Sequence, residues 1–98
     1  MTVNITSVHF KADQKLETFI SGKIEKLAKL FSEIIGAEVM LKLENTDNPE
    51  NKITEIKLLI KGSDLFASKQ SKTFEEATDE VIDALKKQIE KYKAKQNK

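Results

Sequence analysis

Residues 37–44 read AEVMLKLE, a segment in which Ala37, Val39, Leu41 and Leu43 alternate with three charged residues and one methionine. Neighbouring side chains of a β-strand point to opposite faces of a sheet, so this pattern predicts a half-buried strand. The fold is therefore expected to contain a sheet with one apolar and one polar face. The apolar face of such a sheet needs a second layer of structure to cover it.

The segment before this strand is predicted to form an amphipathic helix, because its apolar residues recur at every third or fourth position. Asp13 is a suitable N-cap, since its carboxylate accepts a free backbone N–H of the first turn. Gly36 is expected to end the helix in a left-handed C-terminal cap. The predicted core stripe consists of Leu16, Phe19, Ile20, Ile24, Leu27, Leu30 and Phe31.

A longer helix is predicted from about Phe74 to Lys93. Thr73 and Glu76 have the spacing of a capping box, in which each side chain caps the backbone N–H of the other residue. Ile82 is expected at the edge of the apolar stripe, and the lysine-rich end from about residue 94 is expected to be flexible. The stripe itself consists of Phe74, Ala77, Val81, Leu85, Ile89 and Tyr92.

A strand is predicted at Val3–Phe10. Val3 and Ile5 share one face, whereas the apolar residues from Val8 onward have the other parity. Two interpretations stay open: the end of the strand is buried on both faces, or a bulge near Ser7 resets the alternation.

A hairpin is predicted after a loop at residues 45–51, which contains the single proline of the chain. Residues 52–61 form its first strand, residues 62–64 its tight turn and residues 65–69 its short second strand. The apolar face of the first strand consists of Ile56, Leu58 and Ile60.

Together these elements predict an α+β fold with the order β-α-β-β-β-α. We expect a two-layer sandwich, in which a four-stranded sheet carries both helices on one face. A chain of 98 residues is too short for two such cores, so residues 1–98 are expected to form a single domain.

Composition excludes several classes of protein. The chain has no cysteine and one histidine, His9, which argues against disulfides, thiolate metal sites and histidine-rich zinc sites. No apolar run approaches the roughly 20 residues of a membrane span, and the N-terminus does not resemble a signal peptide. We therefore expect a cytoplasmic protein without a metal or another cofactor.

Catalytic residues are not expected, so the protein is predicted not to be an enzyme. There is no glycine-rich loop that would hold a phosphate, and no motif gives His9 the partners of a general base. The carboxylates of the second helix are expected to form a solvated face that complements the helix dipole. These carboxylates belong to Glu75, Glu76, Asp79, Glu80 and Asp83.

Charge is unevenly distributed along the chain. The 17 lysines, with no arginine, oppose 16 carboxylates, for a net charge of +1. Residues 86–98 hold six lysines against one carboxylate, a net charge of +5, whereas residues 1–85 hold eleven lysines against fifteen carboxylates, a net charge of −4. The cluster of lysines in residues 86–98 is suited to binding the phosphates of a nucleic-acid backbone. Lysines at the end of a helix also stabilise its dipole, so this second interpretation stays open.

The first helix carries a lysine stripe of its own. Lys15, Lys26 and Lys29 lie within about 60° of one another around the helix axis, with Lys23 at the margin. If both helices lie on one face of the sheet, these lysines can form a ridge with those of the second helix along one side of the domain.

Short segments along nearly the whole chain are similar to those of one known family. They are residues 4–6 (NIT), 23–27 (KIEKL), 67–68 (AS) and 88–95 (QIEKYKAK), together with the Asp and Leu positions of the second helix. In this order and spacing they resemble the short form of the ribosome hibernation-promoting factor and ribosome-associated inhibitor family. The fold of that family has the same β-α-β-β-β-α order.

The resemblance implies a non-enzymatic factor that binds the small ribosomal subunit in the channel for mRNA and tRNA. Translation would then be inhibited in stationary phase or stress through contacts with ribosomal RNA. The resemblance also implies that the C-terminal dimerisation domain of the long forms is absent, and we expect a monomer when the chain is free. By position it implies a role in RNA binding for Lys23, Lys26, Lys87, Lys91, Lys93 and Lys95. The helical-face argument alone adds Lys15, Lys29 and Lys86.

The alternative function is that of a protein-interaction module. Its binding surface would be the exposed face of the sheet or the acidic flank of the second helix. This alternative predicts saturable binding to a protein partner, without binding to RNA or ribosomes.

Overall fold

Four strands and two helices follow one another in the predicted order in this computed structural model, which describes residues 1–96. The elements are β1 (Thr2–Val8), α1 (Gln14–Leu30), β2 (Ile34–Leu43), β3 (Lys52–Ile60), β4 (Ser63–Ser71) and α2 (Phe74–Gln96).

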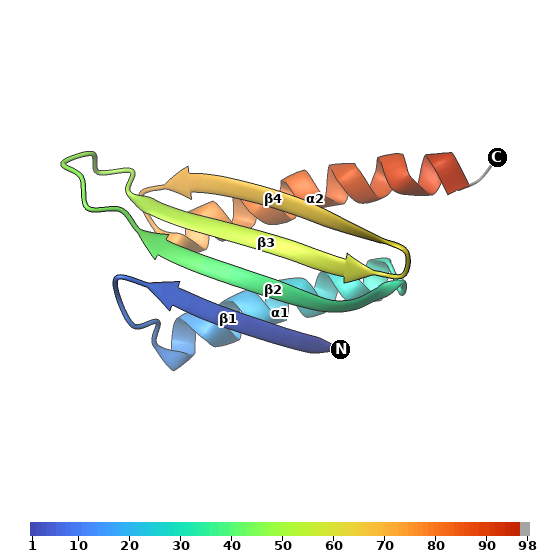
Figure 1. The fold of residues 1–98 in the computed structure, drawn as a ribbon, viewed down its shortest axis with the longest axis horizontal. Helices are drawn as coiled ribbons and strands as arrows, with labels where there is room; N and C mark the ends of the chain where they lie inside the picture. The colour runs from blue at the N-terminus through green and yellow to red at the C-terminus, as the bar shows by residue number, and fades with distance from the viewer. Residues whose placement is uncertain (97–98) are drawn as a thin grey trace.

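Both helices cover the same face of the sheet, and no other element within residues 1–96 covers the opposite face (Figure 1). The strand order is β1-β2-β3-β4, with β1 parallel to β2 and the other neighbours antiparallel. A parallel pair needs a crossover connection, which α1 supplies. The predicted two-layer α+β sandwich is confirmed.

The core contains the residues that the two periodicities place there. Val39, Leu41, Ile56 and Leu58 project from the sheet and are buried against both helices. One predicted core residue is wrong, because Leu30 is 65% exposed. The helix ends at Leu30, and Phe31 leaves it with an extended backbone that takes its ring into the core instead.

Gly36 does not cap the helix. The backbone N–H of Phe31 already bonds to Leu27 O at 3.0 Å, and Gly36 lies in β2, paired with Thr2 of β1. A Cβ atom at Gly36 would stand 3.0 Å from the Thr2 carbonyl oxygen, closer than side chains normally come to a backbone. The glycine is therefore needed for the close approach of β1, so the predicted C-terminal cap is wrong.

The parity change in the first strand has a local cause. The β1–β2 register runs without a break from Thr2 to Val8, which excludes a bulge near Ser7, and both Ser7 and Val8 are half-buried. The strand then ends, and His9 adopts a positive φ of 70°. This turn brings the ring of Phe10 onto that of Phe74, with centroids 4.6 Å apart and planes 12° from parallel.

The β3–β4 hairpin is longer than predicted. Its turn is at Lys61 and Gly62, and Gly62 has the positive φ (85°) that favours glycine. Strand β4 pairs with β3 along its whole length, although most of its side chains are polar or exposed. Hydrophobic alternation alone therefore underestimated this edge strand.

The C-terminal part of α2 packs against the end of α1. Tyr92 meets the ring of Phe31 edge-on at 5.7 Å. The ammonium group of Lys93 donates to Leu30 O at 3.3 Å and lies 5.5 Å from the Phe31 ring centroid. Helix α2 continues to Gln96, beyond the predicted end near Lys93, and the flexibility expected from about residue 94 stays a prediction; residues 97–98 lie outside the described residues.

The two glycines of the first half of the chain are expected to respond oppositely to alanine. Gly36→Ala should destabilise the protein by about 1–2 kcal/mol, because its methyl group presses on the β1 backbone. Gly22→Ala should stabilise it by about 0.5–1 kcal/mol, because Gly22 lies inside α1 and a methyl group there meets nothing within 4 Å. Urea unfolding of both variants measures the difference, and two shifts of the same sign would contradict this account.

Lys93→Ala is expected to lower the free energy of unfolding by about 1 kcal/mol, because the charged hydrogen bond to Leu30 and the contact with Phe31 are lost. Lys91→Ala is the matched control on the same helix, and an exposed lysine of this kind should change stability by less than about 0.5 kcal/mol. Equal unfolding midpoints for the two variants would show that Lys93 has no structural role.

Candidate nucleic-acid interface

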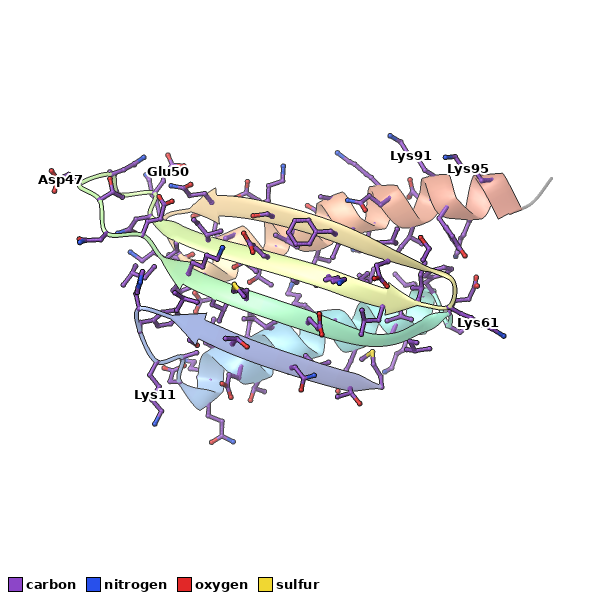
Figure 2. The ribbon with its side chains drawn as sticks, in the orientation of Figure 1. Lys11, Asp47, Glu50, Lys61, Lys91 and Lys95 are labelled. Atoms are coloured by element: carbon purple, nitrogen blue, oxygen red, sulfur yellow. The ribbon has the colours of Figure 1, made fainter. Side chains whose placement is uncertain are left out.

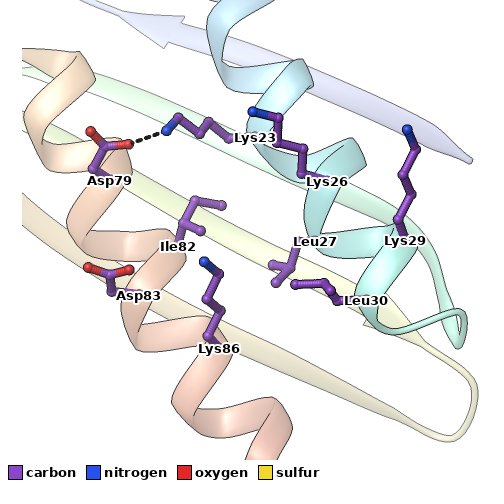
Figure 3. A pocket seen from close by; sticks show the side chains of 9 residues that line it. All are labelled: Lys23, Lys26, Leu27, Lys29, Leu30, Asp79, Ile82, Asp83 and Lys86. Atoms are coloured by element: carbon purple, nitrogen blue, oxygen red, sulfur yellow. Dashed lines mark ion pairs between the residues drawn. The ribbon is translucent and has the colours of Figure 1, made fainter.

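Helices α1 and α2 lie side by side on the sheet and enclose a groove of about 700 Å³ between them (Figure 3). The groove is defined by its lining residues, which come from both helices in nearly equal number. They are Lys23, Lys26, Leu27, Lys29 and Leu30 from α1, and Asp79, Ile82, Asp83 and Lys86 from α2.

Helical spacing explains why these residues meet. Positions three, four and seven apart share one flank of a helix. Lys23 therefore stands beside the apolar stripe of α1, and Lys26 and Lys29 are each turned about 60° further around the axis, toward solvent. On α2 the same spacing places Lys86 beside Ile82, which is buried and not merely at the edge of the core. The groove thus has an apolar floor and lysine-rich walls.

One groove lysine is neutralised within the protein. The Lys23 ammonium group lies 3.0 Å from Asp79 Oδ1 and 5.3 Å from the Phe19 ring centroid. The other three, Lys26, Lys29 and Lys86, form no ion pair with any carboxylate in residues 1–96. Their charges are available to an anionic partner.

Two carboxylates of the groove were not predicted as part of the site. Asp79 and Asp83 are exposed, as expected for the acidic flank of α2, but both line the groove, and Asp79 pairs with Lys23 of α1 (Figure 3). Their spacing to Lys86, seven and three residues, placed all three on one helix face. The sequence did not show that this face of α2 would lie beside α1.

Three further lysines of α2 form a second surface. Two of them, Lys87 and Lys91, line a separate hollow with Lys69 of β4 and two carboxylates of α2. Lys95 follows Lys91 by four residues, and the two stand together on the outer side of α2 (Figure 2). We call Lys87, Lys91 and Lys95 the outer stripe. The single ridge expected from sequence is therefore divided into a groove and an outer stripe.

Two lysines that were predicted to bind RNA belong to neither surface. Lys93 is held by Leu30 and Phe31 at the end of α1. Lys15 is exposed in the first turn of α1, three turns and about 16 Å from Lys26 along the helix. It does not line the groove. Lys93 and Lys15 therefore lie apart from both the groove and the outer stripe.

A cluster of metal ligands and a helix long and apolar enough to span a membrane are both absent from the described residues. Across residues 1–96, no three His, Cys, Asp or Glu side chains gather as they would around a metal ion. His9 is exposed and its Nδ1 lies 3.3 Å from Leu43 O. In the same range, neither helix combines the length and hydropathy of a membrane span.

Curated relatives that match the chain carry the name ribosome hibernation promoting factor. The protein of Escherichia coli (strain K12) is 30% identical over 95 residues, which cover 97% of this chain and 96% of the relative. The protein of Pseudomonas putida (strain KT2440) is 29% identical over 96 residues, covering 98% and 90% respectively.

Solved structures share the fold. A ribosomal subunit interface protein from Coxiella burnetii superposes with a TM-score of 0.84 at 21% identity, covering 96% of this chain and 99% of its own. The N-terminal domain of Thermus thermophilus Protein Y superposes with a TM-score of 0.76 at 16% identity, covering 93% and 94% respectively.

A sequence profile of one family matches residues 3–97, nearly the whole chain. That family is described as Sigma 54 modulation protein / S30EA ribosomal protein. The resemblance seen in the short segments of the sequence is confirmed, and this protein belongs to the Sigma 54 modulation protein / S30EA ribosomal protein family.

Proposed function

We propose that this protein is a cytoplasmic ribosome hibernation factor. In this proposal the monomeric chain, acting as a single ribosome-binding domain, occupies the channel for mRNA and tRNA on the small subunit during stationary phase or stress. Translation stops because the channel is filled, without any catalytic step. The names of the curated relatives support the ribosomal role. The observation that carries the proposed mode of binding is the groove, in which three unpaired lysines from two helices face one opening.

Lysine is well suited to such a contact. An ammonium group acts as a compact point charge that binds phosphate oxygens, and each phosphate it neutralises releases a counterion. The chain has no arginine, the residue that most often reads guanine by a bidentate contact. Recognition is therefore proposed to depend on the shape and backbone of ribosomal RNA and not on base sequence.

The unequal charge distribution supports binding through one side of the molecule. Residues 1–85 carry a net charge of −4, so a phosphate-rich surface repels most of the chain and attracts the groove and the outer stripe. A protein of net charge +1 is then able to bind RNA in one orientation without adhering to it generally.

Neutralising either lysine surface is expected to weaken co-sedimentation with purified small subunits. The groove variant replaces Lys26, Lys29 and Lys86 with Gln, and the outer-stripe variant replaces Lys87, Lys91 and Lys95. Each should lower the log–log salt dependence of binding by about 2, since each phosphate contact contributes about 0.7.

The matched control replaces Lys11, Lys52 and Lys72 with Gln, which removes the same charge at the opposite end of the sheet. This control should leave both affinity and salt dependence unchanged. Equal losses in all three variants would indicate a general charge effect, and unchanged binding of the groove variant would contradict the proposed surface.

The groove carboxylates are expected to oppose RNA binding. Replacing Asp79 and Asp83 with Asn removes two negative charges from the groove and releases Lys23 from its ion pair. Affinity for small subunits should rise about threefold to tenfold at low salt, because charges a few ångströms apart interact by about 1 kcal/mol in water.

The control for this variant changes Glu25 and Glu33, two exposed residues that lie outside the groove, to Gln. Equilibrium binding at two salt concentrations measures both variants. A similar gain in affinity for the control would mean that total charge matters and groove geometry does not.

A further inference from the structure

The sheet face opposite the helices has a different character from the lysine surfaces. Its exposed residues form rows across the four strands. One row contains Asn4, Glu38, Lys57 and Phe66, in consecutive cross-strand pairs. Figure 2 views the molecule from this side, with the helices behind the sheet.

Apolar side chains are exposed on this face. Phe66 is 53% exposed and Met40, in the neighbouring row, is 36% exposed. Both line a shallow hollow of about 270 Å³, together with Asn4, Thr6 and Glu38. At this hollow an aromatic ring and an apolar side chain are thus both accessible to another molecule.

The lysines of this face are already neutralised. Lys42 pairs with Glu55 at 3.5 Å, and Lys57 pairs with Asp64 at 3.7 Å. Glu38, in contrast, forms no ion pair with any lysine in residues 1–96. The charge left unbalanced on this face is therefore a carboxylate. A phosphate backbone would be repelled where a basic side chain would be attracted.

We propose that the exposed sheet face binds a basic segment of a protein partner. An arginine or lysine of the partner pairs with Glu38, and a second, two positions along the extended segment and so on the same face, lies over the ring of Phe66. The aliphatic stem of one of these long side chains contacts Met40. Glu38 and Phe66 are two strands apart, about 10 Å; two extended residues span about 7 Å, and the long basic side chains reach across the remainder. This inference goes beyond the proposed function, which concerns the helix side, and gives the domain an RNA-facing side and a protein-facing side.

The first test uses the isolated chain and does not depend on ribosome binding. The ¹⁵N-labelled protein is titrated with a synthetic heptapeptide of alternating arginine and leucine, and with a second peptide in which glutamate replaces arginine. The largest amide shifts are expected at Glu38, Met40 and Phe66 with the arginine peptide only. The proposal would be overturned if the arginine peptide gave no shifts, or shifts confined to the helices. It would also be overturned if the glutamate peptide gave equal shifts at these three residues.

Matched variants identify the contacts. Glu38→Lys should abolish the shifts, and Phe66→Ser should weaken peptide binding about twofold to fivefold through loss of the cation–π contact. The controls are Glu25→Lys and Ile35→Ser, which change an exposed carboxylate and an exposed apolar residue elsewhere. Thermal unfolding verifies that each variant is folded. If the controls weakened binding as much as the sheet variants, the assigned surface would be wrong.

The second test identifies the partner class on the ribosome. A photo-crosslinking phenylalanine analogue at position 66 is activated in the complex with small subunits. A covalent adduct with a ribosomal protein is expected. An adduct with ribosomal RNA, an adduct between two copies of this chain, or no adduct in a formed complex would each overturn the proposal. If no complex forms, the proposed function fails instead, and the peptide titration still decides the sheet surface.

Discussion

Burial of Val39, Leu41, Ile56 and Leu58 requires both helices on one side of the sheet, because the alternate residues of the same strands are mostly polar. This constraint makes α1 and α2 neighbours, and their polar flanks then face each other across a groove. Lysines placed so close repel one another, but water weakens the repulsion to about 1 kcal/mol for charges a few ångströms apart, and salt screens it at separations beyond about 10 Å. The core that holds the fold together is thus also the reason that the lysine-rich flanks face one another.

Much of the fold was predictable because it depends on periodicity. The helical stripe and the alternation of residues 37–44 both correspond to buried faces in the structure. The errors arose where a distant contact decides the outcome. Gly36 is adjacent to a helix in sequence, yet the atom that constrains it is the Thr2 carbonyl, more than thirty residues away. Similarly, β4 is extended by pairing with β3 and not by its own hydrophobic pattern.

The candidate site was predictable to a lesser extent. Helical angles identified Lys26, Lys29 and Lys86, and the structure places all three in one groove. Angles around a single axis contain no information on how that helix is rotated against its neighbour. For this reason Asp79 was assigned to open solvent although it pairs with Lys23, and the lysines of α2 were expected to form one surface although they form two.

The position of α2 in the chain also has a consequence for synthesis. Val81, Leu85 and Ile89 complete the core, and they belong to the last element of the sequence. A chain emerges from the ribosome with its N-terminus first, so α1 alone covers part of the apolar face of the sheet until α2 has emerged. We therefore expect this domain to complete its fold only once α2 is clear of the ribosome, because the strands paired before then still expose apolar side chains.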